Sequence, residues 1–410
     1  MLLKNTLSYI SGSFTPADIR INSDAGIITE IARGLAAHDG ERCIDAQGLH
    51  CAPGFVDLHV HLRDPGFTYK EDIYTGLAAA ACGGFTAVAA MPNTSPVIDT
   101  PELVGYELRR SAKAGCRLLP LAAVTKGQKS RELVDFDALS AAGAVGFSDD
   151  GQPVSTPMML AAMRTAAERG YLILSHPEDK SVYDPSVISA PPEAEDLGID
   201  RDICLAGHTG ARLHLCHVST AWGMDSVRRA KRAGLRVTAE TCPHYFTLTQ
   251  NDLARIGANA RMSPPLRTKA NRSAVLDAIA DGTVDCISTD HAPHLPEEKE
   301  KPLAETPNGI IGLQTSLPLG VTMLVREGVI TLERLIELMS VSPAKIIGLP
   351  EKRIAEGAPA DLALFDPDES FIFSERMIRS KSRNSPFIGR RMYGRVRMTV
   401  LRGELVWREI

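Results

Sequence analysis

Residues 54–62 read "GFVDLHVHL" and continue as "RDPG" to residue 66. Polar and apolar residues alternate here, as in a β-strand with two different faces. The alternation predicts that one face carries Asp57, His59, His61 and Arg63. The other face is predicted to carry Val56, Leu58, Val60 and Leu62. A single inward histidine is usually a hydrogen-bonded core residue, but two on one face can chelate one metal ion, so this strand predicts a metal site.

Seven further stretches have the same β-rich character: 85–93, 117–127, 143–151, 171–179, 212–220, 236–246 and 284–294. Helix-like segments such as "MMLAAMRTAAERG" (158–170) separate most of them. Strand and helix alternating eight times predict an α/β fold, a parallel (β/α)8 TIM barrel. A doubly wound open sheet is the alternative, but it would not naturally place polar chemistry at the ends of so many strands.

The two ends of the chain have a different pattern. Residues 1–52 and 350–410 contain short strand-like runs joined by glycine turns, without long helices between them. We expect them to form one small β-sandwich domain built from both termini, and residues 53–349 to form the barrel.

Composition and charge exclude several classes of protein. The chain has 44% hydrophobic and 23% charged residues and a net charge of −5, which offers no basic surface for nucleic acid or anionic membranes. Its most apolar run, "GLAAAACGGFTAVAAMP" (76–92), is broken by two glycines. The eight cysteines form no C-x-x-C pair, as is usual for reduced thiols. These features favour a cytoplasmic protein that binds neither nucleic acid nor membranes.

Polar residues also end four other predicted strands: His176, His217, Asp290 and the adjacent pair Asp149 and Asp150. Strand ends converge on one face of such a barrel, where active sites lie. With the first strand's two histidines, four imidazoles and two carboxylates suffice for two metal ions that share a carboxylate. "SDDG" is also strong turn chemistry, so the pattern alone does not settle whether either aspartate of the pair enters the site.

The remaining histidines are weaker candidates. Those in flanking or loop contexts are His38, His50 and His208. His214 is an odd number of residues from His217, and His291 is adjacent to Asp290, so alternation places both on the opposite face. His244, in "CPHYF", remains a minor site candidate.

Several motifs occur in the order and spacing of the amidohydrolase superfamily: "PGFVDLHVHLRDPG", "AMPNT", "GFSDDG", "SHPED", "CHVST", "SPPLR" and "STDHAPH" followed by "EK". The combination of "HLRDPG", "MPNT" and "DHAPH" resembles class I bacterial dihydroorotases, and the similarity extends over nearly the whole chain. The resemblance implies zinc-dependent, reversible cyclisation of N-carbamoyl-L-aspartate to L-dihydroorotate, a step of pyrimidine (UMP) biosynthesis.

The resemblance also implies roles for individual residues. One zinc ion would be held by His59, His61 and Asp290, and the second by His176 and His217. Asp150 and a hydroxide would bridge the two ions, and Asp290 would also transfer the proton in catalysis. Substrate contacts would come from His61, Arg63, Asn93, Ser263, His294, Asn308 and Gly309. Two of these depart from the family pattern, because Ser263 stands where asparagine is usual and Asn308 where phenylalanine is usual.

Two alternatives belong to the same superfamily. Hydantoinases and allantoinases use a carboxylated lysine on the fourth strand, but "GAVGFSDDG" contains no lysine. An inactive scaffold that supports aspartate transcarbamoylase would be expected to lose metal ligands, whereas this chain keeps all six. We expect a homodimer that forms a complex with aspartate transcarbamoylase, and a mobile lid at 294–309, because this segment is charged, proline-rich and follows the last strand.

Overall fold

The computed structural model describes residues 1–46, 48–184 and 189–409, and it confirms the predicted barrel. The eight neighbouring strands are parallel, run in sequence order, and lie within the eight predicted stretches. They are β6 (Phe55–Val60), β7 (Phe85–Ala90), β8 (Arg117–Ala122), β9 (Gly146–Phe147), β10 (Leu172–Ser175), β11 (Arg212–Leu215), β12 (Val237–Thr241) and β13 (Cys286–Ile287). A parallel bridge between Val60 and His291 brings the first and last strands together.

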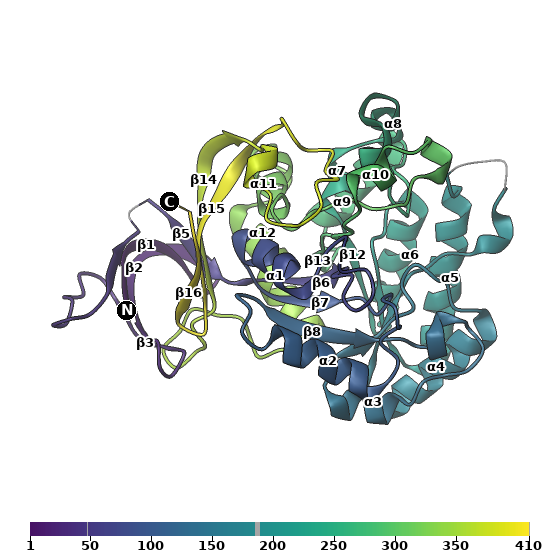
Figure 1. The fold of residues 1–410 in the computed structure, drawn as a ribbon, viewed down its shortest axis with the longest axis horizontal. Helices are drawn as coiled ribbons and strands as arrows, with labels where there is room; N and C mark the ends of the chain where they lie inside the picture. The colour runs from purple at the N-terminus through teal and green to yellow at the C-terminus, as the bar shows by residue number, and fades with distance from the viewer. Residues whose placement is uncertain (47, 185–188, 410) are drawn as a thin grey trace.

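Helices surround the strands, as Figure 1 shows. The longer ones are α1 (Ile73–Cys82), α2 (Pro101–Ser111), α3 (Phe136–Ala142), α4 (Thr156–Arg169), α5 (Pro192–Thr209), α6 (Ala221–Arg232) and α9 (Lys269–Ala280). The shorter ones are α7 (Pro243–Thr247), α8 (Gln250–Ile256), α10 (Pro296–Lys299), α11 (Ser316–Gly320), α12 (Leu332–Ile336) and α13 (Ser342–Ile346). α4 and α5 have a proline in the first turn and end at Gly170 and Gly210, whose φ angles of 75° and 72° suit a left-handed cap.

The packing of side chains inside the barrel differs from the alternation predicted along β6, and the prediction was wrong for Val56 and Leu58. Val56 and Leu58 pack with residues of the neighbouring strands, such as Leu121 and Leu174, and with α13. Val60 and Leu62 instead belong to the larger hydrophobic cluster that includes the helices. The pairing of β6 with β7 shifts register between Asp57 and Val60, which is the mark of a bulge. The extra residue in this bulge therefore reverses which face of β6 points into the barrel, just before the two histidines.

The termini form the predicted small β structure. Its strands are β1 (Leu2–Ile10), β2 (Ser13–Asn22), β3 (Ile27–Ala32), β4 (Cys43–Asp45), β5 (His50–Pro53), β14 (Leu362–Ile372), β15 (Arg391–Leu401) and β16 (Glu404–Arg408). They make one sheet in the order β16-β15-β14-β5-β1-β2-β3, with β4 beside β1. The sheet folds over a core that joins Ile19 and Ile28 to Leu362 and Val400, so one continuous sheet supplies both layers.

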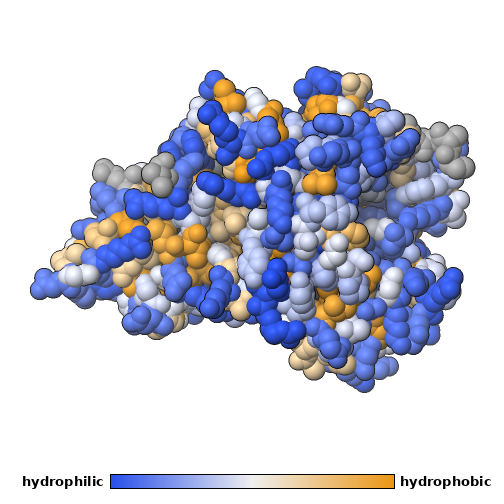
Figure 2. All heavy atoms as spheres, in the orientation of Figure 1, coloured by the Kyte–Doolittle hydropathy of each residue, from blue (hydrophilic) through white to orange (hydrophobic). Residues whose placement is uncertain are grey.

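The chain between β14 and β15 leaves this sheet and reaches the barrel. There Ser380 donates a hydrogen bond to the buried carboxylate of Glu71, and the Ser382 hydroxyl donates to the Lys70 carbonyl at 2.7 Å. The face drawn in Figure 2 is mostly hydrophilic, with apolar groups gathered over the terminal sheet. Among the described residues, no helix is long and apolar enough to span a bilayer.

Candidate metal centre and substrate cavity

Six buried side chains meet at the C-terminal ends of the barrel strands: His59, His61, Asp150, His176, His217 and Asp290. The Asp150 carboxylate is their common neighbour. Its oxygens lie 3.2 Å from His176 Nδ1, 3.4 Å from His59 Nε2 and His217 Nε2, and 3.5 Å from His61 Nε2. Although burial opposes it, these imidazoles hold the pKa of Asp150 well below its ordinary value.

Two possible metal-binding groups share this aspartate. One is His59, His61 and Asp150, and the other is Asp150, His176 and His217. Asp290 lies beside the first group, with its Oδ1 3.1 Å from His61 Nε2 and 3.5 Å from His59 Nε2. The arrangement can therefore present one carboxylate to two neighbouring cations.

The nitrogen His59 Nε2 tests whether this cluster suits a cation. His59 Nδ1 donates to Glu240 at 2.8 Å, so Nε2 is the ring nitrogen that faces the cluster. That nitrogen is buried and has no hydrogen-bond partner in the described part of the chain, yet it faces the carboxylates of Asp150 and Asp290. Two carboxylates facing one buried imidazole nitrogen require a positive charge between them, and although burial opposes it they raise the pKa of His59 well above its ordinary value. The imidazole and carboxylate donors therefore fit a divalent metal such as zinc.

Backbone strain accompanies three residues of this region. Arg63, His217 and Asp290 have φ angles of 61°, 41° and 48°, in the left-handed region that non-glycine residues rarely occupy. They follow β6, β11 and β13, where the chain turns out of the barrel. Strained conformations of this kind cluster at functional sites.

The adjacent aspartates after β9 point to different partners. Asp149 accepts hydrogen bonds from the Val124 N–H at 2.7 Å, from the Thr125 N–H at 3.2 Å and from the Thr125 hydroxyl. Burial raises the pKa of Asp149 to about 6. Asp149 therefore links two loops at the mouth of the barrel, whereas Asp150 faces the histidines.

A cavity of about 380 Å³ opens above the six candidate metal ligands, which together we call the metal cluster. Asp150, His176 and Asp290 line it. It is also lined by all seven predicted substrate residues: His61, Arg63, Asn93, Ser263, His294, Asn308 and Gly309. The Asn93 side-chain oxygen accepts a hydrogen bond from His61 Nδ1 at 2.9 Å, which joins this cavity wall to the metal cluster.

On the opposite wall of the cavity, His294 forms hydrogen bonds with its neighbours. Its Nε2 donates to the Asn308 carbonyl at 2.8 Å, and Lys70 Nζ donates to its Nδ1 at 3.4 Å. Burial and the charge of Arg63 lower the pKa of His294 to about 2, so the ring is neutral. Arg63 Nη2 lies 3.3 Å from His294 Nε2, and its Nε donates to the Pro293 carbonyl at 3.3 Å. The cavity thus carries a half-buried guanidinium next to the metal cluster.

The structure corrects the placement of His214 and shows residues that the sequence did not single out. His214 does not face away from the cluster: its Nε2 lies 3.2 Å from Glu240, which also contacts His59. β11 ends at Leu215, so strand alternation does not extend to His217. Glu178 accepts from His176 Nε2 at 3.3 Å, and its place in the "SHPED" motif was the only signal for it.

Two other histidines lie outside the cluster. His291 is buried, and its Nδ1 accepts from the Gly312 N–H at 3.2 Å, away from the cavity. His244 is buried against the Tyr245 ring, with centroids 4.2 Å apart, and burial lowers its pKa to about 4.

Comparison with known proteins agrees with this geometry. A family model described as "Dihydro-orotase-like" matches residues 50–222, and one described as "Amidohydrolase family" matches residues 193–407. A dihydroorotase of Geobacter sp. (strain M21) is 44% identical over 93% of both chains. A dihydroorotase of Clostridioides difficile (strain 630) is also 44% identical over 93% of both chains.

Solved structures of related enzymes have the same fold. The L-hydantoinase (dihydropyrimidinase) of Arthrobacter aurescens has a TM-score of 0.91 and 28% identity, with 99% of this chain and 96% of that chain covered. The dihydropyrimidinase of Brevibacillus agri NCHU1002 has a TM-score of 0.88 and 26% identity, with 99% and 95% covered. Sequence identity is thus much higher to the dihydroorotases, and this chain belongs to the dihydroorotase family of the amidohydrolase superfamily.

Proposed function

We propose that this protein is a dihydroorotase, which cyclises N-carbamoyl-L-aspartate reversibly to L-dihydroorotate in UMP biosynthesis. The observation that carries the proposal is a single buried aspartate, Asp150, placed between four imidazoles and next to a cavity lined by the half-buried Arg63. Relatives named dihydroorotase match over 93% of their length and of this chain, which supports the same activity here.

Membership of the family implies a divalent metal, and we propose two zinc ions per chain. One would be held by His59, His61 and Asp290, the other by His176 and His217, with Asp150 shared between them. When bound, such a pair supplies Lewis acidity and lowers the pKa of water toward 7. His59 Nε2, buried and facing two carboxylates, supports this assignment most directly.

The chain's own residues would bind the substrate and move the proton. Asp290, at the junction of cluster and cavity, would accept a proton from the attacking water and return it to the leaving nitrogen. Arg63 would bind the substrate carboxylate through two parallel hydrogen bonds, assisted by Asn93 and His294. Ser263, Asn308 and Gly309 would contact the ring from the far wall.

Hydantoinase activity is the second candidate, because the structural neighbours include an L-hydantoinase. Two features oppose it. Residues 143–151, which include β9 and the turn after it, carry no lysine that could be carboxylated, and Arg63 in the cavity wall suits an anionic substrate. An inactive scaffold is opposed by the retention of all six proposed ligands.

One experiment separates these functions. Metal analysis of the purified protein would be combined with assays on carbamoyl aspartate, dihydroorotate, hydantoin and allantoin. We expect about two zinc ions per chain and far faster turnover of the first two compounds. Comparable rates on hydantoin would contradict the proposed substrate, and absence of both zinc and activity would favour the scaffold.

We further propose a cytoplasmic homodimer that associates with aspartate transcarbamoylase. The proposal follows from the family resemblance. Light scattering after size-exclusion chromatography, with and without the transcarbamoylase, tests it: a monomeric mass would contradict the homodimer, and an unchanged elution would contradict the complex.

A further inference from the structure

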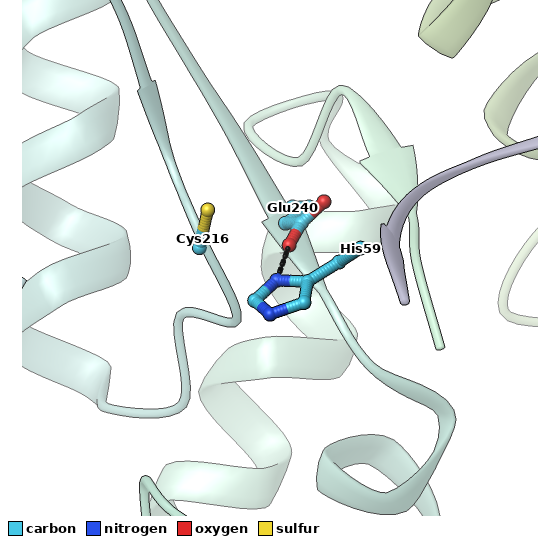
Figure 3. A group of neighbouring side chains, drawn as sticks. All are labelled: His59, Cys216 and Glu240. Carbon is cyan, nitrogen blue, oxygen red and sulfur yellow. Dashed lines mark hydrogen bonds and ion pairs between the residues drawn. The ribbon is translucent and has the colours of Figure 1, made fainter. Parts of the chain in front are cut away.

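Glu240 is a fully buried carboxylate on β12, beneath the metal cluster. Figure 3 shows it opposite His59, with Cys216 nearby and a hydrogen bond between Glu240 and the imidazole. Glu240 Oε1 accepts from His59 Nδ1 at 2.8 Å and from the His217 N–H at 3.4 Å. Glu240 Oε2 accepts from His214 Nε2 at 3.2 Å, and the Thr238 hydroxyl lies 2.8 Å from the other nitrogen of that ring. One carboxylate thus contacts both halves of the cluster.

The two contacts of Oε1 have different consequences. The bond from His59 Nδ1 fixes the ring orientation and leaves Nε2 free as the metal ligand. The bond from His217 N–H holds the backbone where its φ angle is 41°, and so holds the side chain of a residue in the second group. A buried acceptor at this position can therefore determine the geometry of both groups.

A separate metal bound by His59, Cys216 and Glu240 is a competing explanation, because these three side chains also lie close together. Two ligands on one tetrahedral zinc, with bonds near 2.1 Å, would lie about 3.4 Å apart. The observed 2.8 Å between His59 Nδ1 and Glu240 Oε1 is instead a hydrogen-bond distance.

The partners of Glu240 also show how its charge is compensated. In the described ranges of the chain its only ion pairs are with His59 and His214, and no lysine or arginine pairs with it. Both of its oxygens accept hydrogen bonds from N–H groups, which is the role of a carboxylate. An ionised acceptor increases the basicity of His59 toward a metal more than a neutral amide would.

We infer that Glu240 is a positioning residue that holds His59 and the His217 backbone in the arrangement that binds two metal ions. This inference rests on the proposed metal-dependent function. It assigns to β12 a role in metal affinity, although β12 provides no proposed metal ligand.

The test compares Glu240→Gln with Glu107→Gln. The first variant keeps the side-chain shape and removes the charge. The control residue Glu107 is also buried, on α2, and its change to glutamine likewise keeps the side-chain shape. Zinc affinity is measured by competition with a chelator, without substrate, while circular dichroism monitors the fold. We expect zinc affinity to fall about 10- to 100-fold in Glu240→Gln and to stay unchanged in the control.

Glu240→Asp provides a second variant, which keeps the charge but shortens the side chain. We expect its zinc affinity to lie between those of wild type and Glu240→Gln, and this comparison remains available if the amide variant does not fold. Wild-type zinc affinity in Glu240→Gln, or equal losses in Glu240→Gln and Glu107→Gln, would overturn the inference. If the wild-type protein binds no zinc, the proposed function fails instead.

Discussion

Asp149 and Asp150 are neighbours in sequence but should differ sharply in function. We expect Asp150→Ala to lose bound zinc and nearly all activity, because this carboxylate is the common neighbour of four imidazoles. Asp149→Ala should keep most zinc and instead lower the free energy of unfolding by about 1–3 kcal/mol, since it leaves buried donors of Val124 and Thr125 without their acceptor. Zinc per chain, turnover at saturating zinc and urea unfolding measure these effects. If Asp149→Ala loses the bound zinc, the roles assigned to the two aspartates are reversed. If zinc content is unchanged in both variants, neither aspartate binds metal and "SDDG" is only a turn.

Arg63 tests whether the substrate is held by a planar cation. Arg63→Lys should lower kcat/KM for dihydroorotate roughly 10- to 100-fold, because an ammonium cannot form two parallel hydrogen bonds to a carboxylate. Arg229→Lys, an exchange of the same type on the exposed face of α6, is the control and should have no effect. Nearly normal kcat/KM in Arg63→Lys would exclude Arg63 from substrate binding.

At the scale of single elements, periodicity predicted all eight barrel strands but not the details within them. The bulge in β6 could not be foreseen, since no glycine or proline marks it between Asp57 and Val60. Nothing in the sequence marked Glu240 as a functional residue, because "RVTAETC" is an ordinary strand sequence. Only the closure of the barrel brings β12 opposite His59. The histidine pair was identifiable because His59 lies on β6 and His61 directly follows its last residue, whereas long-range partners require the tertiary fold.

The segment 294–309 contains both an anchored part and the predicted lid. Lys299, the last residue of α10, donates from Nζ to the carbonyls of Pro307 and Gly309 at 2.9 Å each. Glu300 and Glu305 beside it are exposed. If the segment orders over substrate, dihydroorotate should protect it from a glutamate-specific protease. Identical cleavage with and without dihydroorotate would contradict a lid.

Lys299 should also make the free energy of unfolding depend on pH. Burial lowers the pKa of Lys299 to about 7, whereas lysine in an unfolded chain titrates near 10.4. Between these values the unfolded chain binds more protons, so this residue makes the free energy of unfolding rise with pH. We expect Lys299→Met to reduce the rise between pH 7 and pH 9.5 in urea unfolding. Lys301→Met, at an exposed lysine two residues away, is the control; an equal rise in wild type and Lys299→Met would contradict the expectation.

At the scale of the whole molecule, the terminal sheet and the barrel are connected through the segment between β14 and β15. Its residue Asn384 is buried at the barrel mouth. Its Nδ2 donates to the carbonyls of Ala292 and Gly309 at 3.0 Å, and its Oδ1 accepts from the His294 N–H at 3.1 Å. A residue from the C-terminal part of the chain thus joins two loops of the substrate cavity. The sequence could not predict this, because 75 to 92 residues separate Asn384 from its three partners.

Asn384→Ala should therefore lower kcat/KM at least tenfold while zinc content stays at the wild-type value. The variant leaves the peptide groups of Ala292, Gly309 and His294 without their partner, so the cavity wall loses its fixed shape, but it touches no proposed metal ligand. Asn22→Ala is the matched control, because the Asn22 side chain accepts two backbone hydrogen bonds in an exposed turn of the terminal sheet. Kinetics on dihydroorotate and metal analysis of both variants decide the question. Equal kcat/KM in the two variants would show that the terminal sheet does not support the site, and zinc loss in Asn384→Ala would show that the segment acts on the metal cluster instead.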